Sequence, residues 1–282
     1  MSQRCSDISR AAGVPLSASA TTAETWLLIE VPGGWPRDVS AAGGLPSEAH
    51  EAVAAWLAGT PRSRLQFIRR PGTASGDRSL AFVVGARERR GDVRRIELAD
   101  PAGLARTDLG TAGEPVDSSL VLVCGHGSRD ACCALRGTAV FGALVERLGE
   151  EELWISSHQG GHRFAANVLV LPAGLQFGRV EPEEAPFLVA RALAGRIELG
   201  RYRGRTCFEP IVQAAEQAVR EAAGLDGVLE LELAEVEGSM VCFRSWEGAE
   251  HTAIVEEVPG PAVPASCGAD PEELAVLHGR VV

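Results

Sequence analysis

The chain of 282 residues contains no lysine, so all 27 of its basic side chains are arginine. We attribute this absence to coding bias rather than to a mechanism. Basic residues are also outnumbered by the 38 acidic ones, and the net charge of -11 argues against a nucleic-acid partner, which favours a basic surface. An acidic surface suits docking onto a basic partner, and it suits solubility equally well.

Long apolar segments are missing too. No stretch approaches the ~20 apolar residues that a membrane-spanning helix needs. The apolar core of a secretory signal peptide is absent from the first residues, MSQRCSDISRAAG. We therefore expect a cytoplasmic protein without a membrane partner. The seven cysteines agree with this expectation, because an odd number in a reducing compartment favours metal ligation or redox chemistry over a disulfide framework.

Familiar catalytic motifs are also absent. The sequence contains no G-x-S-x-G elbow, no Walker loop and no C-x-x-C pair. We find no two carboxylates that can be placed as the acid and nucleophile of a glycosidase. We predict no catalytic residues, and we expect an electron carrier rather than an enzyme with a substrate of its own.

Hydrophobic periodicity predicts an α/β protein. Residues 119–195 follow the order β-α-β-β-β-α, which is typical of a thioredoxin-like mixed sheet flanked by helices. Residues 25–99 follow β-α-β-β-β with nearly the same spacing, and the pair Arg37-Asp38 matches Arg129-Asp130 of the second half. We interpret the two halves as a degenerate duplication whose first copy lost its ligands.

Three units are predicted from this pattern. They are a degenerate thioredoxin-like half (1–110), a thioredoxin-like ferredoxin domain that carries a metal site (117–200) and a small α+β extension (201–282). The segment 1–22 is expected to be loose, and the segment 100–118 to be a linker rich in Pro, Gly, Asp and Thr. The tail from residue 259 is expected to be irregular and to end in a short helix.

Two pairs of soft ligands follow two of the predicted strands. Cys124 and Cys133 are spaced C-x8-C, and His158 and His162 are spaced H-x3-H. In a β-α-β unit with parallel strands, the loops after both strands lie at the same end of the sheet. Thiolates and imidazoles suit zinc or an iron-sulfur cluster, so the sequence predicts a metal site at this edge.

The spacing alone leaves zinc and iron-sulfur nearly even. Gly160 and Gly161 between the histidines favour a tight loop with close backbone approach, as a cluster whose sulfides accept N–H bonds requires. Compact zinc sites usually take their cysteines from C-x2–4-C knuckles, whereas an eight-residue gap wraps a larger object. Cys132 and His126 are alternative ligands in the first loop. The other cysteines are interpreted as buried bystanders: Cys5, Cys207, Cys242 and Cys267.

Several stretches resemble the sucraseferredoxin-like family of the thioredoxin-like [2Fe-2S] ferredoxins. They are CGHGSRDACC and SSHQGGHRFAANVLVLPAGLQFGRV, with TWLLIEVPGGWPRD upstream and RGRTCFEPIVQAAEQAVR downstream. The resemblance implies a [2Fe-2S] cluster ligated by two Cys and two His, and a redox protein partner such as a ferredoxin reductase. The implied ligands are Cys124, Cys133, His158 and His162. The family spacing favours Cys133 over Cys132.

This ligand set suggests a mechanism. If each pair holds one iron, the ligation is of the Rieske type, and neutral imidazoles raise the reduction potential above that of all-Cys ferredoxins. Each ligating imidazole keeps a second nitrogen for a proton, so we hypothesise a one-electron carrier with proton coupling. The alternatives are a structural zinc protein with the same four ligands, and a cluster-free thiol enzyme that uses Cys132 or Cys133.

Further residues are expected around the site by position. The glycine N–H groups are candidate donors to sulfur, Arg129 offsets charge or binds a partner, Asp130 caps the next helix or pairs with Arg129, and Asn167 braces the histidine loop. The full set is Gly125, His126, Gly127, Arg129, Asp130, Cys132, Gly160, Gly161 and Asn167.

Overall fold

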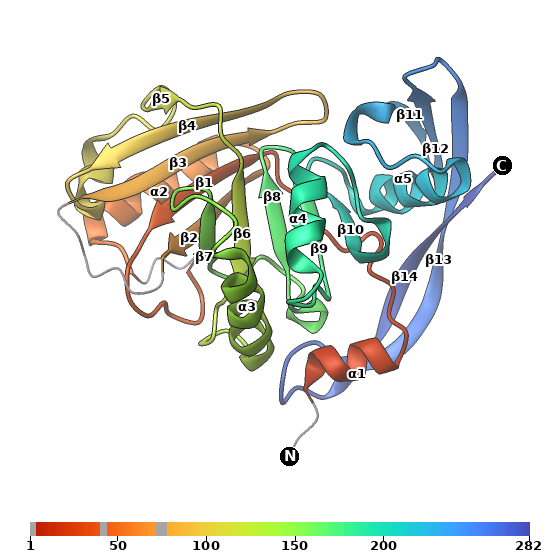
Figure 1. The fold of residues 1–282 in the computed structure, drawn as a ribbon, viewed down its shortest axis with the longest axis horizontal. Coiled ribbons are helices and arrows are strands. Elements are labelled where there is room, and N and C mark those ends of the chain that lie inside the picture. Colours follow the sequence, from red (N-terminus) through yellow and green to blue (C-terminus); the bar gives the residue numbers. More distant parts are fainter. Residues whose placement is uncertain (1–3, 40–43, 71–77) are drawn as a thin grey trace.

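The computed structural model describes residues 4–39, 44–70 and 78–282. Its main feature is a mixed sheet of ten strands in the order β10-β9-β8-β6-β7-β2-β1-β3-β4-β5 (Figure 1). The strands are β1 (Thr25–Glu30), β2 (Ser63–Arg69), β3 (Ser79–Ala86), β4 (Gly91–Leu98), β5 (Glu114–Pro115), β6 (Leu120–Cys124), β7 (Leu153–Ser156), β8 (Val168–Leu171), β9 (Leu175–Phe177) and β10 (Tyr202–Arg205). The predicted mixed α/β class is confirmed.

Each half of this sheet repeats one strand order. In β2-β1-β3-β4 the first two strands are parallel and the others antiparallel, and β7-β6-β8-β9 has the same arrangement. The two halves join edge to edge where β2 and β7 pair antiparallel, with Ile68 opposite Ser156 and Arg69 opposite Ile155. The boundaries of the three predicted units stay a prediction.

Helices pack against the ten-stranded sheet and contribute side chains to the hydrophobic core. The α-helices are α1 (Cys5–Ala11), α2 (Ser47–Gly59), α3 (Ala131–Leu144), α4 (Ala185–Leu193) and α5 (Pro210–Ala223), and the 3-10 helices are η1 (Pro101–Arg106), η2 (His162–Phe164), η3 (Leu199–Arg201) and η4 (Val228–Glu230). Buried side chains of α2, α3 and α4 share one cluster with Ile29 of β1 and Val123 of β6. The alternate side chains of these strands form a second cluster, in which the rings of Phe82 and Trp154 lie 5.9 Å apart. None of the described helices is long and apolar enough to cross a membrane.

A second, antiparallel sheet follows α5. It contains β11 (Leu231–Glu237), β12 (Met240–Ser245), β13 (Glu250–Pro264) and β14 (Pro271–Val281) in sequence order. The helix expected at the end of the chain is wrong, because this segment is β14, whose Ala275 lies opposite Pro259 of β13. Pairing along most of β13 supplies hydrogen bonds that a short isolated helix lacks.

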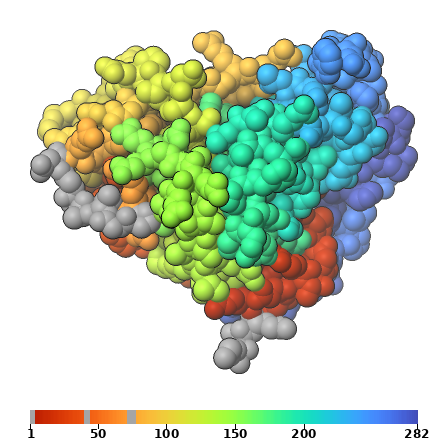
Figure 2. All heavy atoms as spheres, in the orientation of Figure 1, coloured from red at the N-terminus to blue at the C-terminus, as the bar shows by residue number. Residues whose placement is uncertain are grey.

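Residues 4–22 pack against the rest of the structure, although the segment 1–22 is expected to be loose. Helix α1 lies beside the ends of β13 and β14 (Figure 1), and Figure 2 shows the segment packed against the rest of the molecule. Arg136 of α3 forms an ion pair with Asp7, and the backbone N–H of Thr21 donates to Gln176 Oε1 at 2.7 Å. These contacts come from distant parts of the chain, which a local pattern does not reveal.

The segment 100–118 is not a simple linker either. Asp100 caps η1 by accepting from the N–H of Ala102 at 2.8 Å, and Leu104 is fully buried in the main cluster. The polar residues of this segment form turns and a helix cap, but its two leucines, Leu104 and Leu109, belong to the core.

Candidate metal centre

The ends of two parallel strands position the predicted ligands. Strand β6 ends at Cys124, which lies opposite Ser156 at the end of β7. The chain then leaves β6 through a loop to α3, and Cys133 occupies the first turn of that helix. The loop after β7 carries His158 toward the same edge, as the parallel register requires.

Three of the four predicted ligands converge. Cys124, Cys133 and His158 each offer a ligand atom, and these atoms lie within 4.8 Å of one another. Both cysteines are buried, whereas His158 is half-buried. The fourth residue, His162, is adjacent: its ring centroid lies 4.9 Å from that of His158, and its Nε2 lies 3.9 Å from Oδ2 of Asp130.

The imidazoles have nitrogens without hydrogen-bond partners. Nδ1 of His158 and both ring nitrogens of His162 are buried and make no hydrogen bond to the residues described. A buried polar atom left without a partner costs about 1–3 kcal/mol. A metal centre would use such lone pairs, so the donor set of thiols and imidazoles fits zinc or an iron-sulfur cluster.

The two buried thiols lie within 4.8 Å of each other, and each affects the pKa of the other. Hydrogen bonding with Cys133 lowers the pKa of Cys124 well below its usual value; His158 and the backbone N–H of Gln159 lower it further. The same hydrogen bonding and burial raise the pKa of Cys133. Burial, followed by the charge of His158, lowers the pKa of His162. The site therefore favours a thiolate at Cys124 and a neutral imidazole at His162, the forms that bind metal.

His126, the alternative ligand, has both ring nitrogens occupied. Its Nδ1 accepts from the backbone N–H of His158 at 3.1 Å, so its Nε2 carries the proton that it shares with the carbonyl of Pro36 at 2.8 Å. Burial lowers its pKa, which keeps the ring neutral. His126 thus joins the two ligand loops from the border of the site.

The glycines of the loops after β6 and β7 matter mainly for the backbone conformation of these loops. Gly125 is not available as a donor, because its N–H bonds to the carbonyl of Ser156 at 3.1 Å. Gly160 and Gly161 have φ values of 91° and 66°, a left-handed conformation that glycine adopts without strain. Gly127 is exposed at the turn before α3.

Asn167 contacts the histidine loop, as its predicted bracing role requires. Its Nδ2 donates to the carbonyl of Gly161 at 3.1 Å, and its Oδ1 accepts from Nη1 of Arg203 at 2.8 Å. Nη1 of Arg203 also donates to the carbonyl of Gly160 at 3.1 Å. Arg203 is 1% exposed, and burial lowers its pKa to about 9. Sequence reasoning assigned no role to Arg203, although this residue begins the stretch RGRTCFEPIVQAAEQAVR that resembles the family; its strand β10 lies in a polar run whose composition does not indicate burial.

Asp130 caps α3, the first of its two predicted roles. It accepts from the N–H of Cys132 at 2.8 Å and also from the N–H of Cys267 at 2.8 Å. Burial alone would raise the pKa of Asp130, but these bonds outweigh burial and lower it.

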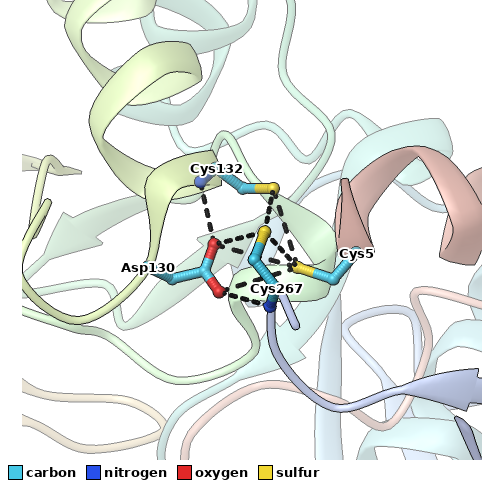
Figure 3. A group of neighbouring side chains, drawn as sticks. All are labelled: Cys5, Asp130, Cys132 and Cys267. Carbon is cyan, nitrogen blue, oxygen red and sulfur yellow. Dashed lines mark hydrogen bonds between the residues drawn. The ribbon is translucent and has the colours of Figure 1, made fainter. Parts of the chain in front are cut away.

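Cys132 points away from Cys124. Its Sγ lies 3.6 Å from that of Cys5 and 3.4 Å from that of Cys267 (Figure 3). The interpretation of Cys5 and Cys267 as bystanders therefore misses a second group of ligand atoms. A hydrogen bond from Cys5 lowers the pKa of Cys132 to about 6. Cys207, by contrast, lies in the apolar cluster between α5 and the second sheet.

A surface cavity of about 400 Å³ opens beside His158. Arg37, Arg64 and Arg129 line it, and Nη2 of Arg64 donates to the carbonyl of His158 at 3.1 Å. Asp38 lines it as well, so the matching dipeptide of the first half lies at the site of the second. The cavity is positive although the chain as a whole is acidic.

Comparisons with known proteins find one family model and several curated relatives. A family model described as "Sucrase/ferredoxin-like" matches residues 16–204. Curated relatives named "Altered inheritance of mitochondria protein 32" include that of Eremothecium gossypii, 36% identical over 110 residues, or 34% of this chain and 35% of the relative. The protein of the same name from Meyerozyma guilliermondii is 33% identical over 101 residues, or 32% of this chain and 36% of the relative. The match thus spans about a third of the length of these relatives. No solved structure matches the chain.

Proposed function

Because this chain belongs to the sucrase/ferredoxin-like family, we propose that it is an electron-transfer protein with a [2Fe-2S] cluster. The ligands we propose are Cys124, Cys133, His158 and His162. The observation that carries the proposal is the convergence of two buried thiols and a histidine at the ends of two parallel strands, beside a second histidine whose nitrogens have no hydrogen-bond partner.

The placement of the two adjacent cysteines supports the choice of ligand. The sulfur of Cys133 lies within 4.8 Å of that of Cys124, whereas the sulfur of Cys132 belongs to another group of side chains. The hydrogen bonds of both ring nitrogens of His126 support excluding it from the ligand set.

Bound here, a [2Fe-2S] cluster supplies reversible one-electron transfer. The residues of the chain orient the donors and limit water. Asn167 and Arg203 hold the histidine loop through the carbonyls of Gly160 and Gly161. An imidazole that ligates through one nitrogen keeps the other for a proton, and at His162 the carboxylate of Asp130 lies 3.9 Å from Nε2. We infer that a proton accompanies the electron.

Metal analysis and spectroscopy of anaerobically purified protein test this function. We expect two irons and two sulfides per chain, visible charge-transfer absorption, and an EPR signal after reduction. Cys124→Ser, Cys133→Ser and His162→Ala should each remove most of the iron. Cys242→Ser and His251→Ala, in the second sheet, are matched controls that should retain it.

Two results would replace the proposal with its alternatives. A colourless protein that loses zinc when both His158 and His162 are substituted would indicate a structural zinc site. A reactive thiol at Cys132 or Cys133 whose activity survives loss of both histidines would indicate a thiol enzyme.

We propose that a redox protein, such as a ferredoxin reductase, docks at the cavity beside His158. Three arginines there suit an acidic patch on the partner. The rate of electron transfer should then fall with rising salt, and Arg37→Gln should lower it, whereas Arg106→Gln, in η1, is the control. Unchanged rates would contradict this docking site. The cytoplasmic location and the absence of nucleic-acid and membrane partners stay predictions.

A further inference from the structure

A second group of ligand atoms lies behind the first turn of α3. It consists of the thiols of Cys5, Cys132 and Cys267 and the carboxylate of Asp130, here called the three-thiol site (Figure 3). Cys5 begins α1, Cys132 lies in the first turn of α3, and Cys267 lies in the connection between β13 and β14. The side chains thus come from three distant parts of the chain and point toward one another.

We propose that the three-thiol site binds one Zn²⁺ ion, separate from the centre at Cys124. The three sulfurs lie 3.6, 3.4 and 3.6 Å from one another. Thiolates bound tetrahedrally to zinc at about 2.3 Å lie roughly 3.8 Å apart, so small movements place all three on one ion. A [2Fe-2S] cluster would divide its ligands between two irons, whereas mutual contact of all three sulfurs indicates a single ion.

Asp130 supplies the fourth donor. Its Oδ1 lies 3.2 Å from Sγ of Cys267 and 3.8 Å from Sγ of Cys5, close to the roughly 3.5 Å expected between sulfur and oxygen ligands of one zinc ion. Its Oδ2 accepts from the backbone N–H of Cys267 at 2.8 Å, which orients the carboxylate. Carboxylate and thiolate are both established zinc ligands.

The surroundings are those of a closed structural site. Cys5 and Cys132 are fully buried, and Asp130 is 5% exposed. The hydroxyl of Ser6 donates to Sγ of Cys132 at 3.3 Å, and Nε of Arg136 in turn donates to that hydroxyl at 3.1 Å. Hydrogen bonds of this kind orient metal ligands from outside the coordination sphere.

Such an ion would fasten α1 and the connection between β13 and β14 to the first turn of α3, which also carries Cys133. Cys5 lies 127 residues before Cys132 in the sequence, and Cys267 lies 135 residues after it. One ion bound to all three would therefore close two long loops of the chain. We expect its removal to loosen α1 and the connection between β13 and β14, and hydrogen exchange there to speed up.

Metal analysis of the full chain, in a background that disables the first centre, tests the proposal. The background is Cys124→Ser with His158→Ala, and the tag is placed at the C-terminus. We expect one zinc per chain in this background and less than a tenth of that when Cys5→Ser or Cys267→Ser is added. Cys242→Ser, a half-buried cysteine in β12, is the matched control and should keep the zinc.

Cobalt provides a measurement that needs no further variant. Co²⁺ added to the metal-free background chain should give intense tetrahedral and thiolate charge-transfer bands that saturate at one equivalent. Absence of both zinc and these bands, zinc retained after Cys267→Ser, or a disulfide among the three cysteines under reducing purification would each overturn the proposal. Zinc that remains while the wild-type chain binds no iron would refute the cluster alone, so the two proposals fail separately.

Discussion

A methyl group at Gly137 should separate the two cysteines of the candidate centre. Gly137 lies on α3 one turn after Cys133, where the helix crosses the end of β6. A Cβ atom there would overlap the carbonyl oxygen of Cys124 and lie 2.9 Å from its carbonyl carbon. Both obstacles are backbone atoms, so no change of rotamer relieves them, and the helix must move away by roughly 1 Å.

The cost follows from this geometry. Overpacking typically costs about 1–3 kcal/mol, and a conflict with backbone belongs at the upper end of that range. Alanine in place of glycine within a helix offsets about 1 kcal/mol of it. We therefore expect Gly137→Ala to lower the free energy of unfolding by about 2 kcal/mol. At a slope of about 2 kcal/mol/M, the urea midpoint falls by about 1 M.

A matched control lies on the same helix. A Cβ at Gly142 meets nothing within 4 Å, so Gly142→Ala should stabilise the chain by about 0.5–1 kcal/mol through helix propensity alone. The measurements are urea unfolding and iron content of both variants, and Gly137→Ala should also bind less iron. If Gly137→Ala unfolds at the wild-type urea concentration and binds a full complement of iron, the close approach of α3 to Cys124 is refuted.

Three further perturbations act on the surroundings of the site. Burial lowers the pKa of His126, so the unfolded chain binds more protons there, and the free energy of unfolding of the metal-free chain should fall below about pH 6.5. His126→Gln should flatten that fall in urea titrations, and an unaltered pH profile would count against it. Asn167→Ala should cost about 1–3 kcal/mol because it removes an acceptor from buried Arg203, whereas Asn167→Asp keeps an acceptor and should cost less; equal costs would exclude this role. If proton coupling holds, potentiometry should show a potential that falls by up to about 59 mV per pH unit over the range in which a ligating imidazole loses its proton, and a flat potential would argue against coupling.

Much of the fold is predictable because many of its strands have a recognisable local sequence pattern. The runs TWLLIE and LVLVC have apolar centres and become the buried central strands β1 and β6. The tail of the chain is different, since PEELAVLHGRV suits a short helix locally but pairs with β13 as β14. The partner strand, not the local propensity, decides that conformation.

The candidate site likewise has a part that the sequence predicts and a part that only the structure shows. Parallel β6 and β7 bring Cys124 and His158 to one edge, and that consequence follows from topology alone. The role of Arg203 does not follow from the sequence, although a stretch resembling the family begins there, because it arises from bonds to Asn167 and to the histidine loop across the fold.

The sequence by itself determined the kinds of ligand and their positions after two strands, because periodicity and loop chemistry are local. Only the tertiary structure decided which sulfur faces which group. Consecutive residues of a helix diverge by about 100°, so Cys133 turns toward Cys124 while Cys132 turns toward Cys5 and Cys267. That second group requires α1 and the connection between β13 and β14 to pack against α3, and no local pattern encodes such long-range contacts.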